Sequence, residues 1–357
     1  MASSAAAARM AELRRRLVLP VIGAPLFIVS TPELVIAQCK AGIVGSFPAL
    51  NARPKEKLDA WLTQIKEALA AHDKEHPDRP AAPFAVNQIV HRSNARLQHD
   101  MEVCVRHRVP LVITSLGART DVNDAVHSYG GLVLHDVIDD RFARKAVSKG
   151  ADGLVAVAAG AGGHAGTISP FALLQEIREW FDGPVALSGA IASGPAVLAA
   201  QAAGADFAYI GSAFIATDEA NASAEYKQAI VDCAASDIVY SDYFTGVAGN
   251  YLKPSIAAAG LDPDALPKAD PSKMDFGAAA GGAAAGGAPQ KRAFASGGSS
   301  TAKAWRDIWG CGQGIGAIKS VGTVEQVVGR MRDGYANAAR RISAEVGGRS
   351  EPPRSRL

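Results

Sequence analysis

Short apolar runs alternate with longer amphipathic segments through the first 215 residues of the chain. The runs are rich in Val, Ile, Leu and Ala and lack polar alternation, which is typical of parallel strands buried on both faces. They predict eight strands, near residues 20–24, 42–46, 83–89, 110–115, 131–135, 152–158, 184–188 and 206–210. Eight successive strand–helix units favour an α/β fold, a (β/α)8 TIM barrel.

The expected helix starts support this alternation. Residues 30–33 and 193–196 each place Ser or Thr ahead of a Pro, which is typical of a helix cap followed by the first helical turn. Ser93 predicts another start, ahead of Leu97 and Met101 at helical spacing. A doubly wound open sheet is the alternative architecture, but no GxGxxG follows the first predicted strand.

Composition divides the chain around this repeat. Residues 1–17 are Ala-rich, and we expect a flexible segment with a frayed helix, whereas residues 18–218 form the predicted barrel. Helical stretches at 219–235 and 324–346 predict a helical addition, made of residues 219–276 and 301–346, that closes over the barrel. Residues 277–300 are rich in Gly, Ala and Ser and predict a flexible segment, and residues 347–357 form a polar tail.

The most informative segment, residues 160–166, follows the sixth apolar run and reads Gly-Ala-Gly-Gly-His-Ala-Gly. Glycines directly after a buried strand allow the backbone to approach a ligand closely. His164 stands among them, and histidine is the side chain best suited to proton transfer near neutral pH. The segment predicts a cofactor lying against the backbone with a proton acceptor above it. The alternative is a structural loop histidine.

Other candidate residues follow the remaining strands, where the active site of a barrel forms. Ala24 and Pro25 come after the first strand and Asn87 after the third. Ser188 and Gly189 end the seventh strand, and Gly211 and Ser212 end the eighth. The loops after the last two strands often hold a phosphate through backbone N–H groups. The alternative is that these glycines only make tight turns.

The remaining titratable residues are less informative. His135 and Asp136 end the fifth strand, and because neighbouring residues of a regular strand point to opposite faces, both should not face one site. Cys311 lies in a Gly-rich stretch, where a small residue in a tight loop is favoured over a thiol nucleophile. His91 is expected near the pocket, and five other histidines are expected at the surface: His72, His76, His99, His107 and His127. No metal site is predicted, because no cluster has ligand spacing.

Charge and cysteine content exclude several classes of protein. The chain has 37 basic and 35 acidic residues and a net charge of +2, which does not favour nucleic acid or a membrane surface as a partner. No apolar run approaches the roughly 20 residues that span a bilayer. The four cysteines are widely spaced and predict reduced, mostly buried thiols of a cytoplasmic protein. Assembly into a homo-oligomer is left open.

Taken in order, these motifs resemble the FMN-dependent nitronate monooxygenases, formerly called 2-nitropropane dioxygenases. The resemblance covers about residues 18–330 and depends on residues 20–25, 84–87, 161–166, 187–191, 209–214 and 312–314. It implies that His164 takes the α-proton of a nitroalkane and that Gly189, Gly211 and Ser212 hold the FMN phosphate. It also implies a flavin site built from six further residues: Ala24, Pro25, Asn87, Gly162, Gly163 and Gln313.

The sequence departs from this family at two places. Many members have a Gln on the sixth strand, where this chain has Val157, and many end the fifth strand with Gly-Thr, where this chain has His135 and Asp136. The resemblance implies oxidation of alkyl nitronates, or nitroalkanes, by O2 to a carbonyl compound and nitrite. The alternatives are an FMN-dependent enoyl-thioester reductase using NAD(P)H, a non-catalytic flavin-binding protein, and a phosphate-binding isomerase or aldolase.

Overall fold

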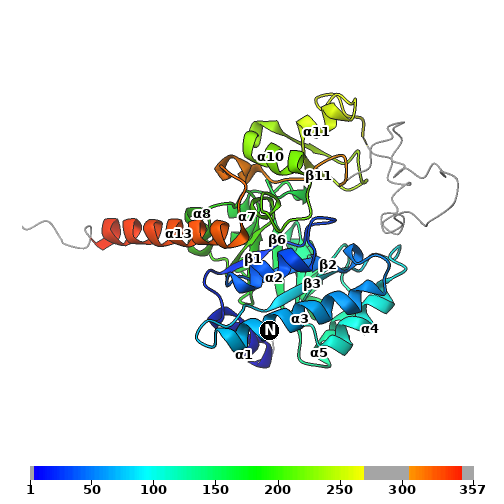
Figure 1. Ribbon diagram of the computed structural model, residues 1–357, viewed down its shortest axis with the longest axis vertical. Helices are drawn as coiled ribbons and strands as arrows, with labels where there is room; N and C mark the ends of the chain where they lie inside the picture. The colour runs from blue at the N-terminus through cyan, green and yellow to red at the C-terminus, as the bar shows by residue number, and fades with distance from the viewer. Residues whose placement is uncertain (1–3, 269–304, 348–357) are drawn as a thin grey trace, which may run out of the picture.

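The computed structural model describes residues 4–268 and 305–347, and its centre is a parallel (β/α)8 barrel (Figure 1). Eight strands pair in the order β1-β9-β8-β6-β5-β4-β3-β2, and a parallel bridge between Ile22 and Val44 joins the two ends of the sheet. The strands are β1 Val21–Gly23, β2 Gly45–Pro48, β3 Phe84–Ile89, β4 Leu111–Ser115, β5 Leu132–Val137, β6 Gly153–Val157, β8 Val185–Ser188 and β9 Phe207–Ile210. The predicted fold is confirmed.

The second strand is displaced from its predicted position. Apolar character begins at residue 42, but β2 begins at Gly45. Gly42 has a φ of 87° and accepts a hydrogen bond from the N–H of Val18. It therefore belongs to the turn that ends the preceding helix, since a positive φ is compatible with glycine and not with a strand.

Helices follow the strands and surround the barrel. They are α2 Pro32–Lys40, α3 Lys57–Glu75, α4 Leu97–His107, α5 Thr120–His127, α6 Asp140–Ser148, α7 Pro170–Arg178 and α8 Gly194–Ala202, with a 3-10 turn, η1, at Ala49–Asn51. The predicted starts before α2 and α8 are confirmed, at Thr31 and Ser193. The start predicted at Ser93 is wrong, because the N–H of Ser93 donates to the ring of His91 in a turn and α4 begins only at Leu97.

One histidine expected at the surface is buried. His72 is 7% exposed and lies on α3 at the end of an apolar stripe formed by Leu58, Leu62, Ile65 and Leu69. Steps of three and four residues place all of these on the same helix face. The polar neighbours of His72 concealed this position in the sequence.

The N-terminal segment is part of the barrel rather than a frayed end. Helix α1, Ser4–Arg15, lies at the lower end of the barrel in Figure 1. Its Met10 and Leu13 are 5% and 6% exposed and pack with the inward side chains of the strands, including Leu111 and Phe207. The expectation of a flexible segment is therefore wrong for residues 4–15, because an apolar stripe of this helix closes the amino-terminal mouth of the barrel.

The C-terminal addition covers the opposite end of the barrel and contains strands as well as helices (Figure 1). Its helices over this end are α10 Ala224–Asp232 and α11 Lys253–Ala258, with 3-10 turns η2 Ala235–Asp237 and η4 Gln313–Ala317. The last helix, α13 Val324–Gly347, packs against α8 at the side of the barrel, and the short helix α9 Ser212–Ile215 directly follows β9. Strands β10 Ile238–Ser241 and β11 Gly249–Leu252 form a small antiparallel sheet with β7, Gly163–His164. The prediction of a purely helical addition missed this sheet.

Two predicted segments lie outside the described residues: 277–300 and, beyond Gly347, the tail. Among the described helices, none has the length and apolar composition that crossing a bilayer requires.

Candidate active site

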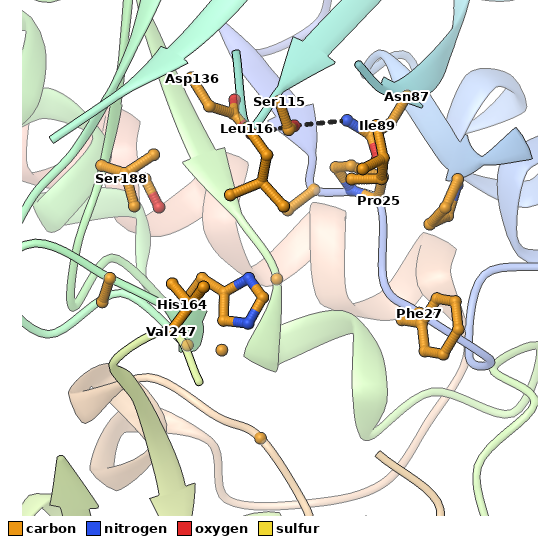
Figure 2. A pocket seen from close by; sticks show the side chains of 18 of the residues that line it. Pro25, Phe27, Asn87, Ile89, Ser115, Leu116, Asp136, His164, Ser188 and Val247 are labelled. Atoms are coloured by element: carbon orange, nitrogen blue, oxygen red, sulfur yellow. Dashed lines mark hydrogen bonds between the residues drawn. The ribbon is translucent and has the colours of Figure 1, made fainter. Parts of the chain in front are cut away.

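A cavity of about 650 Å³ lies at the carboxyl ends of the barrel strands, under the C-terminal addition (Figure 2). Most of the residues predicted from the sequence line it: Ala24, Pro25, Asn87, Gly162, Gly163, His164, Ser188, Gly211 and Ser212. His91 and both His135 and Asp136 line it as well. The barrel therefore brings together residues from six strand ends that are up to 188 positions apart in the sequence.

Two predicted residues do not line the cavity. Gly189 has a φ of 141°, and a Cβ there would lie 2.7 Å from the carbonyl oxygen of Ala159, so it makes a tight turn behind the wall. The side chain of Gln313 is exposed, while its backbone N–H donates to Gly160 at 2.9 Å. These two residues support the glycine-rich loop from outside.

One side of the cavity, which we call the barrel wall, consists of Asn87, Ser115 and Asp136 at the ends of β3, β4 and β5 (Figure 2). The amide of Asn87 donates to the hydroxyl oxygen of Ser115 at 2.7 Å, and also to the carbonyl of Ile113. The Ser115 hydroxyl lies 2.5 Å from Oδ2 of Asp136. The three side chains thus form one continuous hydrogen-bonded row.

Asp136 is a titratable group that the sequence left without a role. Its Oδ1 is buried and has no hydrogen-bond partner among the described residues. Burial raises the pKa of this carboxyl to about 7, against a smaller opposing effect of the Ser115 hydrogen bond. Near neutral pH, Asp136 is therefore divided between its neutral and its charged form.

His135 contributes to the cavity from the other face of β5. Its Nδ1 lies 2.6 Å from the hydroxyl of Thr114, and burial together with the nearby Lys145 lowers its pKa to about 4. The two neighbours do point to opposite faces of the strand, as expected. Both still line the cavity, because a branch of it reaches outward to α6, where Val137, Ile138, Phe142 and Lys145 form its walls.

The opposite side, which we call the cover wall, consists of His164, Thr245 and Trp305. His164 is held by β7, which pairs with β11 of the addition. Nε2 of His164 lies 2.9 Å from the Thr245 hydroxyl, and the Thr245 hydroxyl donates to the carbonyl of Val247 at 3.0 Å. Because that hydroxyl has only one proton, it accepts from His164, which places the imidazole proton on Nε2 and the lone pair on Nδ1.

Burial also determines the charge of His164. Its ring contacts Trp305 edge-on, with the ring centroids 5.4 Å apart, and burial lowers the pKa of the imidazole to about 4. The ring is therefore neutral at pH 7 and able to accept a proton. Sequence reasoning missed Thr245 and Trp305, since both lie far from the glycine-rich segment along the chain and carry no motif.

The glycine-rich loops after β8 and β9 contact the C-terminal addition directly. The Ser212 hydroxyl oxygen accepts a hydrogen bond from the N–H of Gly312 at 2.8 Å, which leaves its proton available to a ligand. Ser212 also begins α9, a short helix directly after the last strand. Such an extra helix is a common component of phosphate sites in this fold. Cys311, next to Gly312, is fully buried, and burial raises the pKa of its thiol far above the usual range, which disfavours a nucleophilic role.

The fold and the site together define a (β/α)8-barrel enzyme with its active centre at the carboxyl ends of the strands. The model of the nitronate monooxygenase family matches residues 12–331. The chain therefore belongs to the nitronate monooxygenase family and is a flavin oxidoreductase, as the sequence motifs implied.

One curated relative and two solved structures illustrate what this chain is similar to. A nitronate monooxygenase of Paraburkholderia phytofirmans is 26% identical over 68% of this chain and 76% of its own length. Nitroalkane oxidase from Streptomyces ansochromogenes has the same fold, with a TM-score of 0.72 and 22% identity over 93% of this chain and 99% of its own. FabK from Thermotoga maritima also shares the fold, with a TM-score of 0.71 and 20% identity over 94% of this chain and 98% of its own. The chain spans between about half and three quarters of the curated relatives it matches.

Proposed function

We propose that the protein binds FMN in this cavity and oxidises alkyl nitronates with O2 to a carbonyl compound and nitrite. The observation that carries the proposal is His164, a half-buried neutral imidazole whose Nε2 lies 2.9 Å from the Thr245 hydroxyl. FMN, when bound, supplies the electron acceptor and the centre that reacts with O2. Membership of a family of flavoenzymes supports the choice of cofactor.

The residues of the cavity fit a flat mononucleotide. Ala24, Gly162 and Gly163 are small and line the cavity, so a planar ring can approach their backbone. Ser212 and Gly211 lie after the last strand, beside the short helix α9, where a phosphate would meet backbone N–H groups and the Ser212 hydroxyl. A Cβ at Gly211 would lie 3.1 Å from Leu26, so a larger residue would narrow this part of the cavity.

His164 has a different task for each form of the substrate. A neutral nitroalkane must lose its α-proton, and the neutral imidazole of His164 can accept it. A nitronate is already deprotonated and does not require this step. The Thr245 contact stabilises the imidazolium that forms, because the Thr245 hydroxyl accepts a hydrogen bond from Nε2 in both charge states.

The test is anaerobic mixing of the FMN-loaded protein with an alkyl nitronate and, separately, with NADPH, while the long-wavelength flavin absorbance is followed. Rapid bleaching by the nitronate but not by NADPH is expected, followed by nitrite release when O2 is admitted. Bleaching by NADPH alone would reject the proposal. Absence of bleaching by either reductant would favour a non-catalytic flavin-binding protein.

Reduction of an enoyl thioester by NAD(P)H is the second candidate. The outward branch of the cavity favours it, since Val137, Ile138 and Phe142 offer an apolar surface to an acyl chain and Lys145 offers a positive charge near its end. In that reaction His164 would donate or orient a proton rather than accept one. The same anaerobic experiment separates the two candidates.

A further inference from the structure

The hydrogen-bonded row of the barrel wall can reverse its direction. Ser115 has one proton and two lone pairs, and one lone pair accepts from Asn87. When Asp136 is charged, the Ser115 proton is held by Oδ2 of the carboxylate. When Asp136 is neutral, its own proton can fill the second lone pair of Ser115. The Ser115 proton is then free to point into the cavity, which Ser115 lines.

The surroundings of Asp136 favour the neutral form. Its Oδ1 is buried and receives no hydrogen bond from the described residues, and no positive charge contributes to lowering its pKa. A charged carboxylate in such a place lacks the partners that would compensate for lost hydration. Burial accordingly raises the pKa of Asp136 to about 7, so that both directions of the row are accessible near neutral pH.

Ser115 also lies across the barrel mouth from the phosphate loops. In the closed strand order, β4 is separated from β8 by β6 and β5, and from β9 by β8, β6 and β5, which places it on the opposite side of an eight-stranded ring. A ligand whose phosphate is held after β8 and β9 and whose ring crosses the mouth would reach the barrel wall. His164 belongs to the other wall (Figure 2).

We propose that neutral Asp136 turns the Ser115 hydroxyl into a hydrogen-bond donor to the ring of the bound flavin. Deprotonation of Asp136 withdraws this donor. This inference depends on the proposed binding of FMN. It makes Ser115 a cofactor-binding residue and Asp136 the positioning residue that acts through it, and it predicts that FMN affinity depends on pH in the absence of any substrate.

Three titratable groups near Asp136, namely Tyr209, His164 and His135, keep one charge state over the range of interest. Tyr209, from β9, has a pKa raised well above its usual value by burial and by the Asp136 charge. Burial lowers the pKa values of His164, from β7, and of His135 to about 4, so both rings are neutral above pH 6. Lys145, from α6, is exposed and acts on His135. β4 and β6 contribute no titratable side chain to this part of the cavity lining.

The experiment measures FMN dissociation constants by fluorescence quenching between pH 6 and pH 9, without substrate. For the natural protein we expect the constant to rise by about tenfold across this range, the size of one hydrogen bond at the upper end of the usual range. Asp136→Asn is the matched control, because its amide cannot ionise and its NH2 group can donate to Ser115 at every pH, as the neutral acid does. This variant also reports the titration of the FMN phosphate itself, which occurs near pH 6.

Asp136→Asn is expected to bind FMN tightly. Its dissociation constant should change with pH only as far as the titration of the FMN phosphate requires. Ser115→Ala is expected to bind about tenfold more weakly at pH 6 and also without pH dependence. A shared pH profile of the natural protein and Asp136→Asn, or an unchanged profile in Ser115→Ala, would overturn the inference. If Asp136→Asn does not fold, the inference is tested by comparing the pH profile of the FMN dissociation constant between the natural protein and Ser115→Ala. Failure of the natural protein to bind FMN at any pH would overturn the cofactor assignment as well, and is recognisable because it appears without a mutation.

Discussion

The two walls of the cavity are built in different ways. The barrel wall takes one polar residue from each of three adjacent parallel strands, so the strand register itself aligns Asn87, Ser115 and Asp136. The cover wall joins His164 to Thr245 and Trp305 through a small sheet and a ring contact between distant segments. The barrel wall therefore carries Ser115 and Asp136, which we assign to the cofactor, and the cover wall carries the proton acceptor.

The largest expected effect comes from the cover wall. His164→Ala should retain FMN but lower turnover of neutral nitroalkanes by about 10²- to 10⁴-fold, the usual contribution of a general base. Turnover of preformed nitronates should fall much less, because no proton has to be removed. Steady-state nitrite assays on both substrate forms measure the difference. Equal losses on both forms would contradict the role of His164 as base.

The contact between the C-terminal addition and the glycine-rich loop can be disrupted by adding a methyl group to the loop. A Cβ at Gly162 would lie 2.6 Å from the backbone nitrogen of Gly312. Because neither backbone can yield easily, Gly162→Ala should destabilise the protein by about 1–3 kcal/mol. Gly316→Ala is the matched control, since nothing lies within 4 Å of the added Cβ. Thermal unfolding of the two variants measures the effect, and equal melting temperatures would show that the loops are not in tight contact.

A smaller effect is expected from the hydrogen bond that orients the imidazole. Thr245→Val removes the acceptor for Nε2 of His164 at nearly constant volume. We expect a loss of about tenfold in kcat/KM for neutral nitroalkanes, equivalent to about 1.4 kcal/mol. Thr245→Ser keeps the hydroxyl and should retain most of the activity. If both variants lost activity equally, the methyl group rather than the hydroxyl would be responsible.

The walls should also differ in how they couple stability to pH. His164 has a pKa of about 4 in the folded protein and about 6.5 when unfolded. The unfolded state therefore binds the extra proton, and this stability is lost as the pH falls from about 6.5 to 4. Asp136 has a pKa of about 7 when folded and about 3.9 when unfolded, so its contribution is lost as the pH rises from about 4 to 7.

One variant can separate the opposite effects of His164 and Asp136 on the pH dependence of stability. Asp136→Asn removes the opposing contribution, so its free energy of unfolding should rise with pH more steeply than that of the natural protein. The difference should approach 1.4 kcal/mol per pH unit between pH 4 and pH 7, the value for one proton. Urea unfolding at four pH values within this range provides the measurement. Parallel curves would show that Asp136 is charged throughout.

The sequence alone determined the eight strands, the (β/α)8 barrel and nine of the residues that line the cavity, because buried parallel strands are continuous apolar runs and active-site residues directly follow them. His164 was predicted for the same reason, as were Ala24, Asn87 and Ser212. The start of α4 and the buried position of His72 were predicted wrongly, since local polar neighbours suggested a cap in one case and a surface in the other.

Only the tertiary structure decided which partners these residues have. Thr245 and Trp305 reach His164 from more than 80 positions away, and no local pattern records a contact of that range. The same holds for α1. Its apolar stripe is buried only because it packs against the open amino-terminal mouth of the folded barrel. Asp136 shows most directly why the sequence alone does not give the charge of a site residue. Its type and position can be read in the sequence, but its charge depends on burial and on Ser115, which belongs to the neighbouring strand.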